Sequence, residues 1–364
     1  MKLAHIADPH LGIRQYHRQT ANGINQREAD VAGAFRSAIT DVIAAAPDAV
    51  LIAGDLFHSV RPTNSAIVFA FHQFQRLRDA LPDAPVILIA GNHDTPRSSE
   101  TGSILKLFGE LGVSVAAEEA RRFTYPALDL SVLAVPHCAL VSGDRPSLRP
   151  EGGERNQVLM LHGEVEGVFP SDRSAVEYGG AAIAPEELVA GEWSYVALGH
   201  YHVQHRVAPR VWYAGALDYC SSNLWGERQD ESQRGVRCKG WLLADLETGT
   251  VEPRGITGTR RVLDLDPIEG AGLDAPSLDA AIQQRIGAVD GGIGDALVRL
   301  VVRDVPRHVA RALDHGAIRA LKSAAVQFNL DVRRPETHRD VGVGAPGRRQ
   351  TLPDVVRGFL TRRI

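Results

Sequence analysis

The sequence has few of the features that mark a disulfide-linked, secreted or membrane-spanning protein. Its 364 residues include only three cysteines, Cys138, Cys220 and Cys238, and none of them form a Cys-x-x-Cys pair. This scatter argues against a disulfide framework and against a structural zinc site. No stretch approaches the roughly 18–20 consecutive apolar residues of a membrane span, and the first residues lack the long apolar segment of a signal peptide. We therefore expect a cytoplasmic protein that does not act in a membrane.

A strong net charge is also missing, but the charges are distributed unevenly. The whole chain carries −4, so its bulk charge does not indicate a nucleic-acid-binding protein. Residues 301–364 hold 13 lysines and arginines against 6 acidic residues, a net of +7, which leaves −11 for residues 1–300. A basic end on an acidic body suits a polyanion-binding segment and equally suits a solvated face. The sequence leaves both interpretations open.

The first 200 residues alternate short apolar runs with helical patterns. Runs rich in Val, Ile and Leu are typical of strands buried on both faces, and the segments between them carry apolar residues at helical spacing. This alternation predicts an α/β core. The expected strands are residues 3–7, 49–53, 86–90, 130–135, 158–161 and 195–198, and the expected helices are residues 27–46, 64–81 and 103–111.

A smaller α+β unit is expected after the core. Residues 262–265, 297–303 and 328–332 have the composition of strands, and residues 307–326 that of a helix. A glycine-rich linker follows, and residues 351–364 place apolar side chains at the spacing of an amphipathic helix. We thus expect three segments, namely a core domain of residues 1–255, an α+β capping domain of residues 256–335, and a linker with a C-terminal helix in residues 336–364.

Polar side chains of the kinds that bind metals follow the ends of the expected strands. Because strand ends at one edge of an α/β sheet converge in space, these side chains are expected to meet in one site. The set contains carboxylates, imidazoles and a carboxamide but no thiolate, which suits two hard or borderline divalent ions. The five motifs are Asp8-Pro-His10, Gly54-Asp55, Gly91-Asn92-His93-Asp94, His162-Gly163 and Gly199-His200-Tyr201-His202.

Such a set predicts hydrolysis of a phosphate ester by two metal ions. A bridging carboxylate, best assigned to Asp55, would hold two ions that share an acidified water, and the resulting hydroxide would attack phosphorus. His93, next to the ligand Asn92 but not itself assigned to a metal, is the best candidate to assist the leaving group. Asp94 is expected to orient His93 or to fix its protonation state.

The ordered motifs resemble the calcineurin-like metallophosphoesterase superfamily. Within it, the chain is similar to the SbcD-type DNA repair exonucleases, the bacterial counterparts of the meiotic-recombination nuclease. The narrower similarity rests on Asp8-Pro-His-Leu-Gly, on Gly54-Asp-Leu-Phe-His58, on Leu161-His-Gly-x-x-x-Gly167, and on the small unit after the core. The resemblance implies a four-layer α-β-β-α sandwich with a C-terminal α+β capping domain.

The resemblance also implies a role for each residue of the motifs. Asp8, His10 and His202 would hold one ion, Asn92, His162 and His200 would hold the other, and Asp55 would bridge them. His93 would be the catalytic histidine, and His58 would help to orient DNA beside the metals. The ions are most simply manganese.

The resemblance further implies three partners: DNA, a second copy of the chain, and an SbcC-like coiled-coil ATPase. The dimer would form through helices of the core domain, and the ATPase would bind the apolar stripe of residues 352–360. Two alternatives remain beside the DNA nuclease, namely a small-molecule phosphodiesterase or phosphatase on the same core, and a non-catalytic binding scaffold. The metal motifs alone do not separate the first alternative from a nuclease, because both reactions use the same hydroxide attack.

Overall fold

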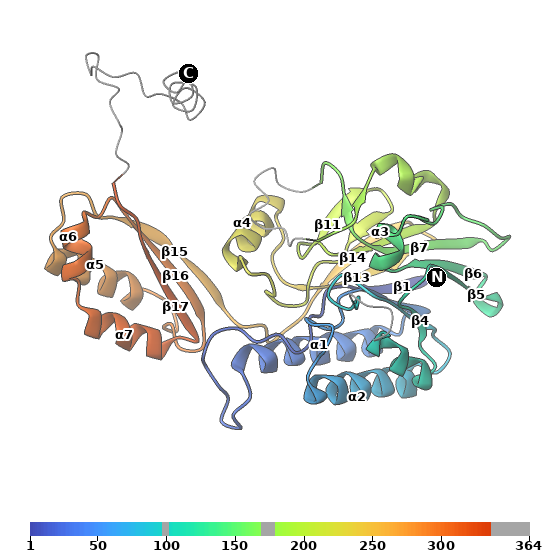
Figure 1. Cartoon of the computed structure of the whole chain (residues 1–364), viewed down its shortest axis with the longest axis horizontal. Coiled ribbons are helices and arrows are strands. Elements are labelled where there is room, and N and C mark those ends of the chain that lie inside the picture. Colours follow the sequence, from blue (N-terminus) through green and yellow to red (C-terminus); the bar gives the residue numbers. More distant parts are fainter. Residues whose placement is uncertain (97–101, 169–178, 336–364) are drawn as a thin grey trace, which may run out of the picture. The chain divides into compact units, whose positions relative to one another are not determined.

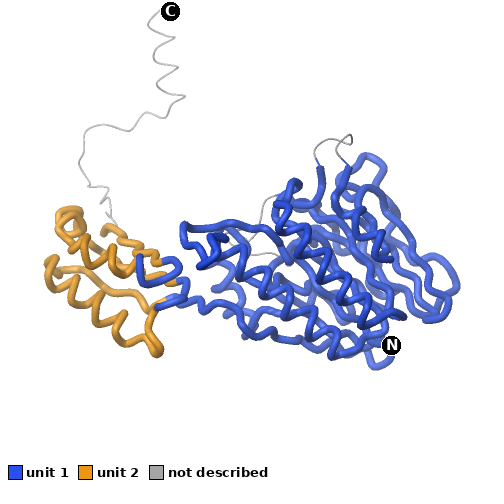
Figure 2. Tube along the Cα trace, turned by 90° about the horizontal axis from the view of Figure 1, so that it is seen from below, with its two compact units in different colours: residues 1–264, 294–297, 323–327 blue, residues 265–293, 298–322, 328–364 orange. Residues whose placement is uncertain are grey.

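The computed structural model describes residues 1–96, 102–168 and 179–335, and these divide into two compact units (Figure 2). Unit 1 comprises Met1–Asp264 together with the short segments Gly294–Leu297 and Ser323–Gln327. Unit 2 comprises Leu265–Ile293, Val298–Lys322 and the described residues from Phe328 on. The units are therefore discontinuous in sequence, and the expected boundary between residues 255 and 256 stays a prediction. Residues 336–364, with the expected linker and amphipathic helix, lie outside the described residues.

Two six-stranded mixed sheets form the centre of unit 1 (Figure 1). In the first sheet, β1, β2, β3 and β4 run parallel, whereas β13 and β14 join antiparallel. Its order is β14 (Thr250–Gly255), β13 (Gly240–Asp245), β1 (Lys2–Ile6), β2 (Ala49–Ala53), β3 (Val86–Ile89), β4 (Ser114–Ala116). The second sheet has the order β11 (His205–Ala208), β12 (Val211–Tyr213), β10 (Tyr195–Gly199), β7 (Asn156–His162), β6 (Leu130–Val135), β5 (Arg121–Tyr125).

The two sheets pack face to face through one apolar layer. Alternate residues of each strand point to opposite faces, so Leu51 of β2 enters the layer between the sheets while Val50 and Ile52 face the helices. The layer combines Leu3, Ile87 and Ile89 of the first sheet with Val132, Val158, Met160 and Ala197 of the second. Since β1, β2, β3, β6, β7 and β10 are almost wholly buried, their sequences read as continuous apolar runs.

Helices cover the outer faces of both sheets (Figure 1). Helix α1 (Gln26–Ala45), helix α2 (Asn64–Ala80) and the 3₁₀ helix η2 (Ile104–Leu111) pack on the first sheet. The short helix α3 (His137–Val141) and the 3₁₀ helix η4 (Pro185–Leu188) pack on the second. The remaining short elements are η3 (Pro126–Leu128), η5 (Ala190–Glu192) and the ribbon of β8 (Glu164–Val165) with β9 (Ala182–Ile183). The expected α/β sandwich is thus confirmed.

Local sequence signals explain where the two long helices begin. The side chain of Asn25 accepts hydrogen bonds from the amides of Arg27 and Glu28 at the start of α1, and Thr63 accepts one from Ala66 at the start of α2. Both residue types are favoured N-caps. One further helix of unit 1, α4 (Leu224–Arg234), has a polar sequence without a clear apolar stripe and was not expected.

Unit 2 is built around the sheet of β15 (Val262–Glu269), β16 (Leu297–Arg303) and β17 (Gln327–Val332). The expected single helix over residues 307–326 is wrong, because the chain forms α6 (Arg307–Ala312) and α7 (His315–Ala324), in addition to α5 (Ala275–Gly287). Leu313 is extended, with φ −60° and ψ 152°. The carboxylate of Asp314 then accepts hydrogen bonds from Gly316 and Ala317, which starts a new helix.

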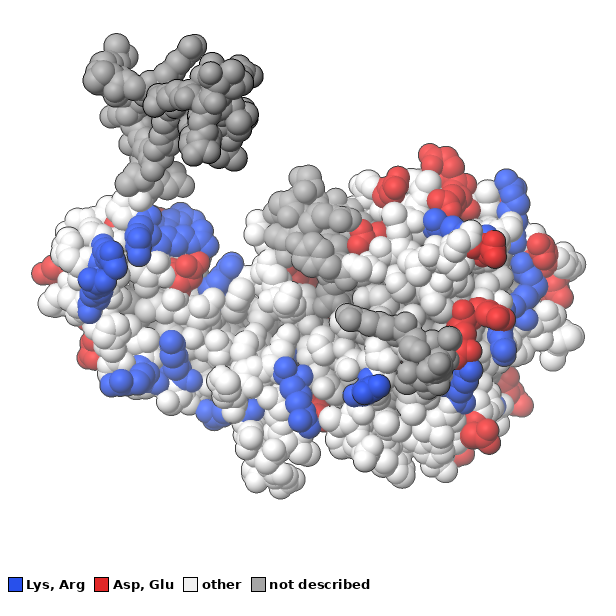
Figure 3. All heavy atoms as spheres, viewed as in Figure 1, with Lys and Arg blue, Asp and Glu red and all other residues white. Residues whose placement is uncertain are grey.

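The basic character of the chain's end is visible on the surface of unit 2. On the face shown in Figure 3, blue side chains lie over unit 2 with a few red ones among them, and red side chains gather, mixed with blue ones, on part of unit 1. The exposed basic residues of β16, α6 and α7 are Arg303, Arg307, Arg311, Arg319 and Lys322.

Over the described ranges, no helix has both the length and the apolar composition that a membrane span requires.

Candidate dinuclear metal centre

The expected metal ligands follow the carboxyl ends of parallel strands in both sheets. Asp8 comes after β1, Asp55 after β2 and Asn92 after β3, whereas His162 ends β7 and His200 follows β10. Hydrogen bonds join the two sheets at this edge. The His162 ring donates from Nδ1 to the carbonyl of Ala53 over 2.9 Å, and the amide of His200 donates to the Asp8 carboxylate over 3.0 Å. The site is therefore fixed by the packing of the two sheets.

One group of donors consists of Asp8, His10 and His202. All three side chains are buried, and their ligand atoms lie within 4.8 Å of one another. Nε2 of His10 lies 3.0 Å from Nε2 of His202. Because each imidazole offers a lone pair on one ring nitrogen when neutral, this pair converges as the ligands of one cation do. The structure thus brings together the three residues expected to hold the first ion.

A second group consists of Asp55, His162 and His200, whose ligand atoms also lie within 4.8 Å of one another. Oδ1 of Asn92 completes this group, at 3.0 Å from Nε2 of His162 and 3.1 Å from Nδ1 of His200. Since Nδ1 of His162 already donates to a backbone carbonyl, its Nε2 is the nitrogen that faces the group. The structure thus brings together the residues expected to hold the second ion.

Asp55 lies between the two groups. Its Oδ2 is 3.7 Å from Nε2 of His10 and 3.3 Å from Nε2 of His162, which belong to different groups. Its Oδ1 accepts a hydrogen bond from the amide of His93 over 2.8 Å. Among the described residues, no hydrogen bond of good geometry reaches the buried Oδ2. Oδ1 is thus held by a backbone amide, and Oδ2 lies beside both groups, where a carboxylate that bridges two ions would be needed.

The electrostatics of the pocket favour positive charge. Burial alone would lower the pKa of His162, but the carboxylates of Asp55 and Asp8 raise it to about 9. Burial would likewise raise the pKa of Asp55, but His162 and His10 hold it well below its usual range. Divalent cations would satisfy the same carboxylates and leave the imidazoles neutral as ligands. The oxygen and nitrogen donors, without a thiolate, therefore fit two hard or borderline ions.

The ligand loops adopt backbone conformations that most residues avoid. Asp8, His10 and Asp55 have φ values of 51°, 47° and 49°, and His200 has 97°. Non-glycine residues at positive φ are uncommon and gather at functional sites. Gly91 lets the third strand end approach closely, because a Cβ there would lie 2.0 Å from Oδ1 of Asp55. The backbone is thus shaped around the convergence of these side chains.

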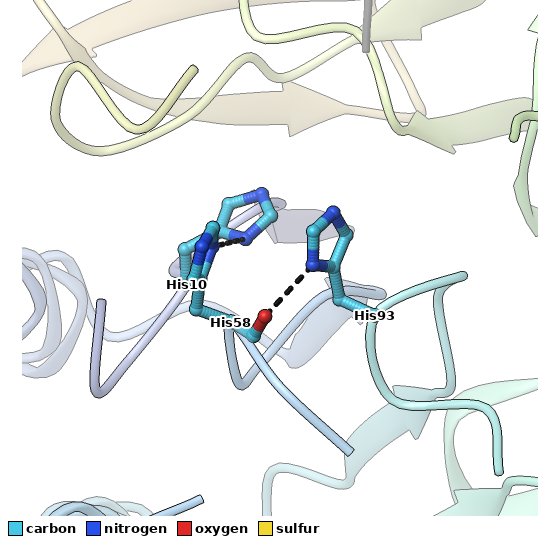
Figure 4. Close-up of side chains that lie close together, drawn as sticks. All are labelled: His10, His58 and His93. Carbon is cyan, nitrogen blue, oxygen red and sulfur yellow. Dashed lines mark hydrogen bonds between the residues drawn. The ribbon is translucent and has the colours of Figure 1, made fainter. Parts of the chain in front are cut away.

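His93 and His58 lie beside His10 at the rim of the site (Figure 4). Nδ1 of His93 donates to the carbonyl oxygen of His58 over 2.8 Å, since a carbonyl can only accept. The rings of His93 and His58 stack with centroids 5.0 Å apart, and Nδ1 of His58 lies 3.3 Å from Nδ1 of His10. His58 is therefore in contact with a candidate metal ligand, and the hydrogen bond at Nδ1 leaves Nε2 as the proton-exchanging nitrogen of His93.

The role expected for Asp94 needs correction. Its carboxylate was expected to orient His93, but it accepts three backbone hydrogen bonds instead, from Leu56 at 3.0 Å, Phe57 at 3.0 Å and Gly91 at 3.1 Å. Asp94 thus ties the loop after β2 to the loop after β3. The His93 ring donates instead to the carbonyl of His58, a contact that no side-chain motif could have indicated.

Two buried carboxylates near the site were missed from the sequence. Oε1 of Glu164 lies 3.3 Å from Nε2 of His200, and Oε2 of Glu227, in α4, lies 3.8 Å from Nδ1 of His202. Lys239 pairs with Glu227 and donates to the carbonyl of His202 over 3.0 Å. The position of Glu164 directly after His162-Gly163 was the one sequence signal that it lies near the site. No sequence signal indicated that Glu227 is buried there.

Residues 1–204 match the family model described as calcineurin-like phosphoesterase. The chain belongs to this family. The expected resemblance to the metallophosphoesterases is therefore confirmed, and the matched region contains every residue of the two donor groups. The family uses divalent metals, and the aspartate and histidine groups described above are of a kind that could hold them.

Several similar proteins are named DNA double-strand break repair protein Mre11. The one from Sulfurisphaera tokodaii is 29% identical over 208 residues, which cover 56% of this chain and 49% of the relative. The one from Haloferax volcanii is 27% identical over 345 residues, which cover 93% of this chain and 68% of the relative. The chain thus spans about half the length of some of these relatives.

Proposed function

We propose that this chain is a two-metal phosphodiesterase that cuts DNA in double-strand-break repair. The observation that carries the proposal is the convergence of seven donors from five separate strand ends in two groups, with Oδ2 of Asp55 beside a histidine of each group. A single displaced strand would break this arrangement. The names of the similar proteins support DNA as the substrate class, and the proposal extends this from them to the present chain.

The proposed ions are most simply manganese. Asp8, His10 and His202 would hold one ion, Asn92, His162 and His200 the other, and Asp55 both. When bound, the ions supply a hydroxide nucleophile at neutral pH and neutralise the growing charge on phosphate oxygens. The protein's own part is to hold these donors in a preorganised pocket. Six of the seven are at most 3% exposed, and Asn92 is half-buried.

His93 is proposed as the group that protonates the leaving oxygen. The His58 carbonyl holds the proton on Nδ1, so that Nε2 carries the exchangeable proton when the ring is charged. The stacked ring of His58 helps to fix the orientation of the His93 imidazole at the rim of the site. His58 is proposed in addition to contact DNA at the entrance, because its ring is only half-buried and packs against both His93 and the expected ligand His10.

A homodimer is proposed through the exposed side of α1 and α2. Phe74 of α2 is not available for such an interface, because it packs on Phe35 and Phe108 in the intramolecular core. Val68 of α2 is 54% exposed, and a cavity of about 400 Å³ lies between the two helices, lined in part by Ala32 and Phe69. Light scattering of the wild type against Val68→Asp tests this surface, and a wild-type monomer would contradict the proposal.

An SbcC-like ATPase is proposed to bind residues 352–360. Deleting residues 350–364 should abolish pull-down of the ATPase and leave metal binding intact. Retained pull-down would show that the ATPase contacts another part of the chain.

The function is tested by a manganese-dependent assay on plasmid, single-stranded and linear double-stranded DNA, with a cyclic nucleotide as the competing substrate. We expect cleavage of DNA and its loss on addition of a chelator. Activity on the cyclic nucleotide without activity on DNA would favour the small-molecule phosphodiesterase. Less than one ion per chain after manganese soaking would favour a non-catalytic scaffold.

A further inference from the structure

Glu164 approaches the metal ligand His200 from the side opposite the candidate ion. Its Oε1 lies 3.3 Å from Nε2 of His200, whereas Nδ1 of the same ring lies 3.1 Å from Oδ1 of Asn92. A carboxylate accepts hydrogen bonds, so this contact places the ring proton on Nε2 and leaves the lone pair on Nδ1. Nε2 of His200 therefore donates to Glu164, and Nδ1 carries the lone pair that would bind the ion.

We propose that Glu164 is a positioning residue that fixes the tautomer and the orientation of His200 for metal binding. This inference rests on the proposed metal centre. A neighbouring ligand is oriented in a similar way, because Nδ1 of His162 donates to the carbonyl of Ala53 over 2.9 Å. Removing such a partner of a metal-bound histidine typically weakens metal binding by 10–100-fold.

The backbone around Glu164 is held from several directions. The amide of Glu164 donates to Ala181 over 2.7 Å, which belongs to the pairing of β8 with β9. The hydroxyl of Tyr213 donates to the carbonyl of Gly163 over 2.8 Å and accepts from the amide of Val165 over 2.9 Å. Glu164 is 7% exposed. The carboxylate is thus presented to His200 by a fixed ribbon and not by a mobile surface chain.

Gly180 provides the space in which the two side chains meet. A Cβ at this position would lie 2.4 Å from Cγ of Glu164 and 2.5 Å from Nε2 of His200. Gly180 does not have a positive φ, so an alanine would suit the backbone, and the atoms nearest to its Cβ would be those of this pair. Gly180→Ala is therefore a variant that disturbs the contact while both partners are kept.

The test measures manganese binding to the metal-free full-length chain by calorimetry, with the ion count checked by elemental analysis. Wild type is expected to bind two ions. Glu164→Ala should weaken one of the two by about 10–100-fold. Glu164→Gln should recover most of the loss, because the amide oxygen accepts the same hydrogen bond. Glu166→Ala is the matched control, since Glu166 lies two residues further on and is exposed.

The possible failures separate the two proposals. A wild-type chain that binds fewer than two ions would overturn the metal centre itself. Two ions bound equally well by wild type and Glu164→Ala would overturn the positioning role alone. Equal losses in Glu164→Gln and Glu164→Ala would show that the negative charge matters and not the hydrogen bond, which also overturns it. Gly180→Ala should weaken the same ion as Glu164→Ala, and wild-type affinity there would contradict the proposal.

Discussion

Replacing Asp94 by asparagine tests how the ligand loops are held together. The Asp94 carboxylate accepts from the amides of Leu56 and Gly91 through Oδ2 and from Phe57 through Oδ1. Asparagine has nearly the same shape but only one acceptor oxygen. If that oxygen takes the place of Oδ2, the NH₂ group faces the amide of Phe57, and a buried donor then loses its partner.

The size of the effect follows from that unsatisfied donor. An unpaired buried amide costs about 1–3 kcal/mol, which for a unit of this size corresponds to a fall of about 2–12 °C in melting temperature. Burial and the Asp55 charge raise the pKa of Asp94 to about 7, against the effect of the three amides. The ionised carboxylate is therefore unfavourable at this position. Removing its charge in Asp94→Asn offsets a part of the free energy lost with the unpaired amide. Asp94→Ala leaves all three amides unpaired and should cost roughly 3–9 kcal/mol by the same reasoning.

The assay is urea unfolding of the metal-free chain, followed by the fluorescence of the buried Trp193 and Trp241. The expected order of stability is wild type, then Asp94→Asn, then Asp94→Ala. Asp83→Asn serves as the control, because Asp83 is exposed and the change should stay within about 0.5 kcal/mol. If Asp94→Asn were as stable as this control, Asp94 would not hold the two loops in the way described.

Three further predictions concern the site and the core. His93→Ala should keep both ions and lose about 10²–10⁴-fold in cleavage rate; elemental analysis and rate measurements check this, and normal cleavage would refute the role of His93. Asp55→Ala should lose metal occupancy as well as activity, and two retained ions would exclude a bridging role. Burial lowers the pKa of His5 to about 3 from its usual 6.5, so below pH 6.5 the unfolded chain binds a proton that the folded chain does not. Stability should thus fall with pH from 6.5 toward 3, by about 2 kcal/mol at pH 5. His5→Asn, which can still bond the Tyr195 hydroxyl, should remove this dependence in urea unfolding at pH 7 and 5; an unchanged pH dependence would show that other groups cause it.

The sequence by itself indicated the α/β core and the residues that meet in the site, and the resemblance to a known family added the sandwich. Buried parallel strands such as β2 read as unbroken apolar runs, because both of their faces are covered. The polar residue that ends each run then marks a strand end, and strand ends of one sheet edge lie together whatever the connecting helices do. This is why Asp8, Asp55 and Asn92 could be grouped without coordinates, although their roles as ligands stay predictions.

Only the tertiary structure decided what supports these residues. The partners of Asp94 are the amides of two loops, the partner of Glu164 is a ring 36 residues away, and Glu227 is buried in a helix with no apolar stripe. The apolar pattern of residues 307–326 also did not indicate that the chain forms two helices there. Each of these features depends on a contact that a local pattern does not encode. Periodicity reports which face of a segment is buried, but the atoms that meet a buried polar group come from elsewhere in the chain.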